Sequence, residues 1–242
     1  MPRLAASARS DSTGHHPEGA PVVFVVDDDP YVREALRLLI GSAGWRALTF
    51  TSAEEFLDWP RATVPGCLVL DVALADLNGP ELQTLLAEQP ELPVIFMASV
   101  ADIPMIVRAI KAGAVEFLMK PFADEALLSA IRHALDTSRA QLASQAKLHT
   151  LKRRHASLTA REKEVMALVV AGLLNKQVGI DLGISEITVK AHRASVMRKM
   201  DADSLPALVR MAAMLGLTPP VRVPTLHVND VGRSMRPVYG VL

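Results

Sequence analysis

Short apolar runs alternate with amphipathic stretches between residues 21 and 140 of the chain. The first run, at residues 22–26, is five apolar residues long, which is typical of a strand buried on both faces. Four similar runs follow, separated by apolar residues at helical spacing. Strands are therefore predicted at residues 22–26, 45–50, 67–71, 93–98 and 114–119, and helices at residues 31–44, 52–59, 79–89, 102–113 and 122–137. This order predicts an α/β domain with a doubly wound five-stranded parallel sheet and helices on both faces.

The pattern changes after residue 157, where apolar residues keep helical spacing and no strand pattern appears. Gly183 permits a tight bend between two of the predicted helices, and Ser185 caps the helix that follows. The helices are predicted at about residues 160–171, 175–182, 186–200 and 204–215, as an all-α domain. The predicted organisation is a disordered head at residues 1–20, the α/β domain at 21–137, a linker helix at 138–156, the all-α domain at 157–217 and an irregular tail at 218–242.

Charge divides the chain in the same way, although the whole chain has a net charge of zero. Residues 21–140 carry 9 Lys and Arg against 17 Asp and Glu, a balance of −8. Residues 141–217 carry 12 against 6, a balance of +6. An acidic domain beside a basic one predicts different partners for the two, with nucleic acid as the partner of the basic one.

Other features of the composition exclude whole classes of protein. The single cysteine, Cys67, excludes an intramolecular disulfide framework, and its apolar neighbours are typical of a buried thiol. No apolar run reaches the roughly 18–20 residues that span a bilayer. The N-terminus lacks the pattern of a signal peptide. We therefore expect a cytoplasmic protein that has no membrane partner.

Acidic residues follow two of the predicted strands. Asp27 and Asp28 come directly after the first strand, and Asp71 ends the third. In a doubly wound sheet these strands are neighbours, and ligands bind outside their carboxyl ends. Carboxylate oxygens suit Mg²⁺, and Lys120, which follows the fifth strand, can stabilise a phosphoryl group. The alternative is a solvated turn in which residues 27–29 only cap the next helix, which an isolated run of three aspartates would favour.

The stretches "VVDDDP", "LVLDV", "PVIFM" and "AGAVEFLMKPF" resemble the receiver domain of two-component response regulators, which has a flavodoxin-like fold. The resemblance covers residues 21–140 and is closest to receivers of the FixJ type. It implies that Asp71 accepts phosphate from a sensor histidine kinase and that Lys120 contacts the phosphoryl group. It further implies a Mg²⁺ site made by Asp27, Asp28, Asp71 and the backbone carbonyl of Ala73, and a switch at Ala98 and Phe117.

Two positions depart from the receiver pattern. Receivers carry Thr or Ser at the end of the fourth strand, where this chain has Ala98. Ser99 follows it, but adjacent residues on a strand point to opposite faces. Ala75 replaces the usual proline in the loop after Asp71, which makes that loop less stiff. Two hypotheses therefore stay open: a switch driven by phosphate, and an atypical regulator that binds DNA independently of phosphorylation.

Residues 158–217 resemble the helix-turn-helix of the LuxR/NarL type, with "EITVKAHRASVMRKM" at residues 186–200 as the recognition helix. Ile187, Val196 and Met200 are expected to anchor this helix inward. The alternative is a small helical bundle with a solvated basic face. By the resemblance, Thr188, Lys190 and Ala191 are expected near the bases, and Lys176, His192, Arg193 and Lys199 near the phosphates.

The two resemblances together imply a transcriptional regulator that forms a homodimer on activation, binds double-stranded promoter DNA and works with RNA polymerase. The last helix carries Leu205, Leu208, Met211 and Leu215 at helical spacing, and some of these must belong to the core. The dimer surface is expected either on this last helix or on the fourth helix, fifth strand and fifth helix of the receiver. An enzyme such as a phosphatase is a rival, but the sequence shows no second nucleophile or general base, and we expect no enzyme. An interaction adaptor that does not bind DNA is the third hypothesis.

Overall fold

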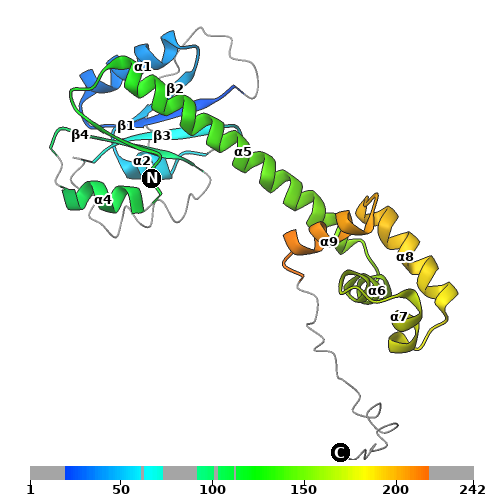
Figure 1. The fold of residues 1–242 in the computed structure, drawn as a ribbon. Coiled ribbons are helices and arrows are strands. Elements are labelled where there is room, and N and C mark those ends of the chain that lie inside the picture. The colour runs from blue at the N-terminus through cyan, green and yellow to red at the C-terminus, as the bar shows by residue number, and fades with distance from the viewer. Residues whose placement is uncertain (1–19, 61–62, 73–91, 101–102, 112, 218–242) are drawn as a thin grey trace, which may run out of the picture. The chain divides into compact units, whose positions relative to one another are not determined.

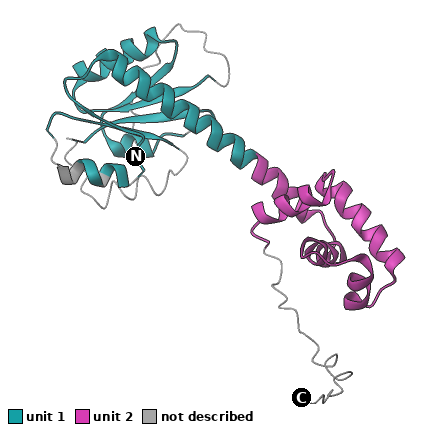
Figure 2. Ribbon diagram, viewed as in Figure 1, with its two compact units in different colours: residues 1–146 teal, residues 147–242 magenta. Residues whose placement is uncertain are grey.

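The computed structural model describes residues 20–60, 63–72, 92–100, 103–111 and 113–217. The chain divides into two compact units, residues 1–146 and 147–242 (Figure 2). The predicted helix at residues 79–89, the loop positions Ala73 and Ala75, the head up to residue 19 and the tail from residue 218 lie outside the described residues.

A parallel five-stranded sheet in the order β2-β1-β3-β4-β5 forms the centre of the first unit (Figure 1). This order places β1 beside β3, so that the residues that follow these two strands meet at one edge. The strands are β1 (Val22–Val26), β2 (Arg46–Phe50), β3 (Gly66–Asp71), β4 (Val94–Ala98) and β5 (Glu116–Met119). The described helices of this unit are α1 (Pro30–Ser42), α2 (Ala53–Leu57), α4 (Ile103–Lys111) and the first part of α5 (Asp124–Ala156).

Helices cover both faces of the sheet, because alternate residues of the central strands point to opposite sides. On one face, Leu36 and Ile40 of α1 and Ile131 of α5 pack against alternate strand residues such as Val69. On the other face, Phe56 of α2 and Ala109 of α4 pack against the intervening strand residues. The three central strands β1, β3 and β4 are buried along their whole length. The continuous apolar runs in the sequence therefore correctly predicted these buried strands and the doubly wound fold.

The second unit is all-helical and contains α6 (Ala160–Val170), α7 (Asn175–Leu182), α8 (Glu186–Met200) and α9 (Leu205–Met214). Its core has two parts. Val165, Val178 and Val189 join α6, α7 and α8, whereas Met166, Val196 and Leu208 join α6, α8 and α9. Thr159 caps α6 by accepting a hydrogen bond from the backbone of Glu162, and the Glu162 carboxylate accepts one from the backbone of Thr159.

Helix α5 is longer than the sequence pattern indicates. We predicted a helix at residues 122–137 and a separate linker at 138–156, but α5 is a single helix of 33 residues, and the division between the two units falls inside it. Residues 138–156 contain neither Gly nor Pro and are rich in Ala, Leu, Gln, Lys and Arg, which favour a helix. No helix among the described residues is both long and apolar enough to span a bilayer.

Candidate functional site

Two carboxylates and one lysine meet at the carboxyl edge of the sheet. Asp27 follows β1, Asp71 is the last residue of β3, and Lys120 follows β5. The Lys120 ammonium donates to Asp71 Oδ2 at 2.6 Å and to Asp27 Oδ2 at 2.8 Å. The backbone N–H of Lys120 donates to the carbonyl of Ala98 at 2.8 Å, which fixes the start of its side chain beside β4. Three segments that are far apart in the sequence therefore form one ion-paired cluster, as their places at strand ends predicted.

Burial controls the electrostatics of this cluster. Asp27 is fully buried and Asp71 is 4 % exposed. Burial raises the pKa of Asp27, although the hydrogen bonds from Lys120 and from the backbone of Asp29 oppose it. Burial by itself lowers the pKa of Lys120, but its hydrogen bonds with Asp27 and Asp71 outweigh burial, and the net pKa is raised. Lys120 is therefore held in its charged form by two acids that need a cation.

The three consecutive aspartates take three different positions. Asp27 points into the cluster, Asp28 is exposed, and Asp29 caps α1 by accepting a hydrogen bond from the backbone of Tyr31 at 2.8 Å. The guanidinium of Arg33 donates to the backbone carbonyl of Asp27 at 2.7 Å and thereby holds this loop against α1. The run thus contains both the pocket residue and the helix cap, the two alternatives that its sequence left open.

The donor set of this cluster fits a hard divalent cation. Two buried carboxylates share one ammonium, and oxygen ligands of this kind suit Mg²⁺. Within the described ranges, no group of three or more His, Cys, Asp or Glu side chains is placed to hold a metal ion. Asp28 is exposed, and Ala73, whose carbonyl was predicted as a ligand, lies outside the described residues. Asp27 and Asp71 are therefore the two predicted ligands whose carboxylates the structure brings together.

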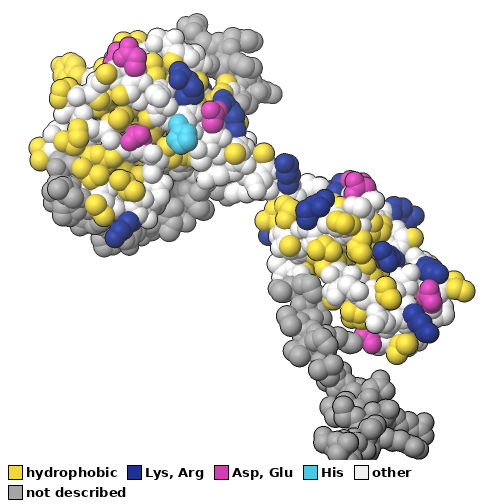
Figure 3. Space-filling view, in the orientation of Figure 1, with side chains coloured by type: hydrophobic (Ala, Val, Ile, Leu, Met, Phe, Trp, Pro, Cys, Tyr) yellow, Lys and Arg dark blue, Asp and Glu magenta, His cyan; other side chains and the backbone are white. Residues whose placement is uncertain are grey.

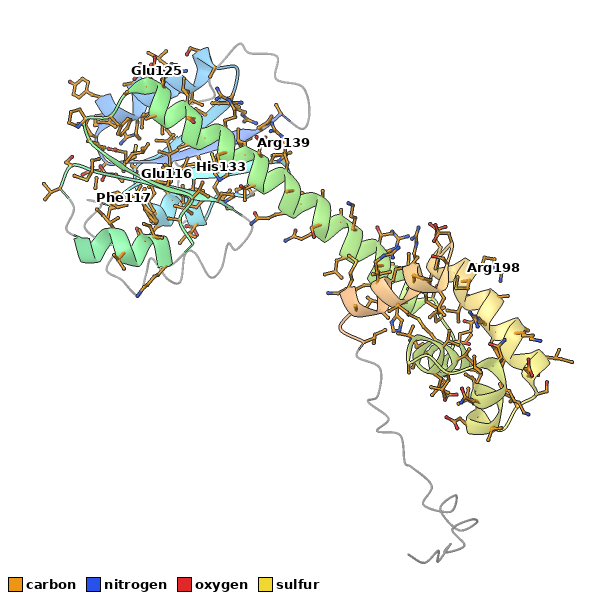
Figure 4. The ribbon with its side chains drawn as sticks, viewed as in Figure 1. Glu116, Phe117, Glu125, His133, Arg139 and Arg198 are labelled. Carbon is orange, nitrogen blue, oxygen red and sulfur yellow. The ribbon has the colours of Figure 1, made fainter. Side chains whose placement is uncertain are left out.

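The two predicted switch positions lie on β4 and β5. Ala98 ends β4 and is 1 % exposed, so its methyl group is buried. Ser99 is exposed beyond the end of the strand. Phe117, labelled in Figure 4, is partly buried on β5 and packs against the core that contains Phe96 and Ala109. No hydroxyl group is therefore present at the end of β4 where receivers carry one.

Helices α7 and α8 form the predicted helix-turn-helix. Gly183 ends α7 with a φ of 64°, a left-handed conformation that glycine adopts at little cost. Ser185 caps α8 by accepting a hydrogen bond from the backbone of Thr188 at 3.1 Å. Gly179 lies opposite this turn, and a Cβ atom there would lie 2.8 Å from the carbonyl oxygen of Ile184. The turn therefore packs closely on α7 because residue 179 has no side chain.

Helix α8 has one buried face and one exposed face. Val189, Val196 and Met200 are 0–1 % exposed and anchor it, which confirms Val196 and Met200 as inward residues. The prediction for Ile187 was wrong, because its side chain is 80 % exposed and Val189 takes the inward place. Positions 187 and 189 are about 200° apart around a helix of 3.6 residues per turn, so both cannot face the core. The exposed residues of α8 are Glu186, Ile187, Lys190, Ala191, Ala194 and Arg198.

The predicted DNA-contacting residues divide by exposure. Lys176, Lys190 and Ala191 are exposed, as contact with DNA requires. Thr188 is partly buried, and its hydroxyl lies 2.8 Å from Ser185 Oγ within the helix cap. His192 and Arg193 are partly buried, and Arg193 donates to the side chain of Asn175 at 3.1 Å. Ile187, Ala194 and Arg198 lie on the same exposed face as Lys190 and were not among the predicted residues; helical spacing from Lys190 would have found them.

Lys199 has a structural partner. Its ammonium donates to Glu162 Oε2 at 2.7 Å, and the Ser195 hydroxyl donates to Glu162 Oε1 at 2.6 Å. The hydrogen bonds from Lys199, Ser195 and the backbone of Thr159 lower the pKa of Glu162 to about 2. Glu162 is 5 % exposed. Because it accepts hydrogen bonds from Ser195 and Lys199, it joins the start of α6 to the end of α8. Figure 3 shows Lys and Arg side chains over the visible face of the second unit. Lys199 belongs to the cations of this unit that have an acidic partner.

The apolar stripe predicted on the last helix faces the core of its own unit. Leu208 is fully buried, and Leu205, Met211 and Leu215 are partly buried against the same core. The exposed large apolar residues of α9 and the turn after it are Val209, Met214 and Leu217. The expectation that some of the stripe belongs to the core is therefore confirmed, and Val209, Met214 and Leu217 are the large apolar residues that α9 and its turn leave exposed for a dimer contact.

Comparison with known proteins identifies both units. Residues 23–132 match the family described as response regulator receiver domain. Residues 156–212 match the family of bacterial regulatory proteins called the luxR family. These two matches cover most of the described residues of the first and second units, respectively.

Full-length relatives share both parts. The response regulator protein TodT of Pseudomonas putida F1 is 44 % identical over 202 residues, which is 83 % of this chain and 89 % of TodT. The transcriptional regulatory protein FixJ of Azorhizobium caulinodans is 44 % identical over 207 residues, which is 84 % of this chain and 96 % of that FixJ. The solved structure of the response regulator StyR is 45 % identical, with a TM-score of 0.70 over 80 % of this chain and 98 % of StyR.

Proposed function

The chain belongs to the response regulators that join a receiver domain to a luxR-family DNA-binding domain, and we propose that phosphate on Asp71 controls its binding to promoter DNA. The observation that carries the proposal is the cluster of Asp27, Asp71 and Lys120, in which a buried carboxylate lies within 2.6 Å of an ammonium at the edge of the sheet. The same chain presents an exposed helix face with Lys190 and Arg198 in a helix-turn-helix.

Asp71 is the proposed nucleophile. One of its carboxylate oxygens forms the new P–O bond while the P–N bond to the kinase histidine breaks, and the histidine nitrogen keeps the electron pair. Bound Mg²⁺, held by Asp27 and Asp71, would neutralise the phosphoryl oxygens and these two acids together. Lys120 already lies against Asp71, so its ammonium is placed to donate to a phosphoryl oxygen after the transfer.

Phosphorylation can be tested without the cognate kinase. The full chain is incubated with acetyl phosphate and Mg²⁺, and its intact mass is measured. Wild type should gain one phosphoryl group, and Asp71→Asn should gain none. Asp124→Asn, which changes an exposed acid at the start of α5, is the matched control and should behave as wild type. Phosphorylation of Asp71→Asn to the same extent as wild type would contradict Asp71 as the acceptor.

The proposed partners follow from the two units. As a response regulator the chain acts with a sensor kinase and with DNA, and we propose that a homodimer binds two half-sites related by two-fold symmetry and contacts RNA polymerase. Exposed apolar residues that support a receiver dimer are Val107 and Ile110 of α4 and Met119 of β5. Because its target is promoter DNA, the proposed compartment is the cytoplasm.

We further propose that the protein has no catalytic turnover of its own beyond its own phosphorylation cycle. Within the described residues, hydrogen bonds from one lysine join the two carboxylates of the acidic cluster, and this lysine is a binding group for a phosphoryl oxygen and not a second nucleophile. The test is the rate at which wild type hydrolyses p-nitrophenyl phosphate, which should equal the rate measured with Asp71→Asn. Sustained turnover by wild type alone would contradict this.

A further inference from the structure

An exposed isoleucine at the start of α8 indicates a further role in DNA recognition, which rests on the proposed binding of DNA. Ile187 is 80 % exposed, and it lies two residues after the helix cap Ser185. The sequence pattern had placed it in the core, yet Val189 fills that place. Within the described part of the second unit, the large side chain of Ile187 therefore belongs to neither of the two core clusters.

The neighbours of Ile187 on α8 define a surface with mixed chemistry. Lys190 and Ala191 follow one turn later, and Ala194 and Arg198 continue the same face, with Arg198 labelled on α8 in Figure 4. The opposite face is the buried one, with Val189, Val196 and Met200. The start of the exposed face carries Ile187 and also Glu186, whose carboxylate pairs with Lys190 at 3.1 Å. The face is small in its middle, at Ala191 and Ala194, and cationic near its end, at Arg198.

This sequence of side chains matches the major groove in charge and shape. The N-terminal residues of a recognition helix contact base edges. Small residues such as Ala191 and Ala194 let the helix backbone approach the bases closely, while Lys190 and Arg198 complement the negative phosphates and the acceptors of guanine. The thymine methyl is the apolar group that the major groove presents, and it is the chemical partner for an exposed isoleucine.

A single exposed apolar residue is common on protein surfaces and by itself needs no partner. Ile187 differs in its position, because it lies in the first turn of the second helix of the helix-turn-helix, on the face of Lys190 and not beside the core. In a helix-turn-helix this second helix is the one that lies in the major groove. Ile180 of α7 provides the contrast within the same unit. It is 73 % exposed, but it lies on the helix before the turn and not on α8.

We propose that Ile187 is a specificity-determining residue that packs against a thymine methyl in each half-site of the DNA. Lys190, one turn away, contacts the neighbouring base pair, so the proposal predicts a half-site in which a thymine lies next to the base pair that Lys190 contacts. Burial of one methyl group corresponds to about a fourfold change in affinity.

The experiment uses the full-length protein and a duplex selected by wild type from a random pool. Each thymine of the half-sites is replaced by uracil, which removes only the methyl group and keeps the hydrogen-bonding edge. Affinities are measured at fixed salt for wild type, Ile187→Ser, Ile187→Val and Ile180→Ser. At one thymine position, replacement by uracil should lower the DNA affinity of wild type and of Ile180→Ser about fourfold per half-site. The same replacement should leave the affinity of Ile187→Ser unchanged. It should lower the affinity of Ile187→Val by most of the wild-type amount.

The outcomes separate the inference from the proposed function. If wild type selects and binds a sequence, but uracil costs Ile187→Ser as much as it costs wild type, Ile187 does not read the methyl group and the inference is overturned. If no uracil position weakens wild type, it is overturned as well. If wild type selects no sequence at all, the DNA-binding function itself fails. Melting curves of the variants show whether each is folded, and because Ile187 is exposed we expect little change in them.

Discussion

The ammonium of Lys120 lies 2.6 Å from Asp71 Oδ2, so the residue proposed to accept phosphate is ion-paired within the described structure. The same ammonium reaches Asp27 Oδ2 at 2.8 Å. One cation therefore serves two buried carboxylates that come from neighbouring strands. The stability of the receiver and its chemistry are linked through this one lysine.

Removal of Lys120 should destabilise the receiver. In Lys120→Ala two buried acids lose their cation, and breaking a buried pair in this way costs about 3–5 kcal/mol. Urea unfolding of the full chain, followed by the fluorescence of Trp45 and Trp59 in the first unit, measures the loss. Added Mg²⁺ should restore part of the stability, because it supplies the missing cation. Lys111→Ala, at an exposed position of α4, is the control. Equal unfolding midpoints for Lys120→Ala and Lys111→Ala would contradict the role of the pair.

Glu162 should make the stability of the DNA-binding unit depend on pH. Its pKa is lowered from 4.5 to about 2 by the hydrogen bonds from Lys199, Ser195 and Thr159. A lowered pKa in the folded state contributes stability that is present above the ordinary pKa of 4.5 and is lost as the pH falls towards 2. The difference in thermal midpoint between wild type and Glu162→Gln should therefore be largest above pH 5 and shrink below pH 4. A difference that stays constant with pH would show that the charge of Glu162 is not the cause.

The absent hydroxyl at Ala98 should limit how strongly phosphate biases the receiver. Ala98→Thr places a hydroxyl at the end of β4, and a hydrogen bond to a charged phosphoryl oxygen contributes about 1.5–3 kcal/mol, roughly tenfold or more in the equilibrium. The measurement is the mass by light scattering with and without Mg²⁺ and beryllofluoride. Ala98→Val is the matched control, because valine has nearly the same volume without the hydroxyl. The account predicts a larger shift to dimer for threonine only; the same response from threonine and valine would contradict it.

Lys176 and Lys199 should differ in their effect on DNA binding, although the sequence placed both at phosphates. Lys176 is exposed, and Lys176→Gln should reduce the slope of log affinity against log salt by about 1. Lys199 is paired with Glu162, and Lys199→Gln should lower the thermal midpoint with little change in that slope. Anisotropy titrations at three salt concentrations and melting curves measure both. A salt slope that falls by the same amount in both variants would show that Lys199 also contacts phosphate.

Residues at strand ends could be predicted from the sequence, because the topology of a parallel sheet fixes where they go. Asp27 and Asp71 meet because β1 and β3 are neighbours, and continuous apolar runs identify such strands. The phase of α8 could not be predicted in the same way. Apolar and small residues occur on both of its faces, so the pattern alone does not decide between Ile187 and Val189 as the inward residue.

Contacts between residues that are distant in the chain could not be predicted from the sequence for a related reason. Nothing near Lys199 indicates that Glu162, 37 residues earlier, receives its ammonium. Gly179 illustrates the same limit. The sequence alone indicates that glycine at position 179 destabilises its helix by about 1 kcal/mol. In the structure, however, a Cβ atom at residue 179 would lie 2.8 Å from the carbonyl oxygen of Ile184. Both depend on the packing of one helix on another, which local patterns do not encode.

The most direct test of the central claim is the DNA affinity of the full chain with and without a phosphate mimic. Anisotropy with a duplex selected by wild type is measured at fixed salt, with Mg²⁺ alone and with Mg²⁺ and beryllofluoride, for wild type and Asp71→Asn. Fluorine NMR reports whether the mimic is bound. The account predicts that the mimic tightens binding by wild type and leaves Asp71→Asn unchanged. Equal affinities for wild type with and without bound mimic would contradict it and would show a regulator that binds DNA independently of phosphorylation.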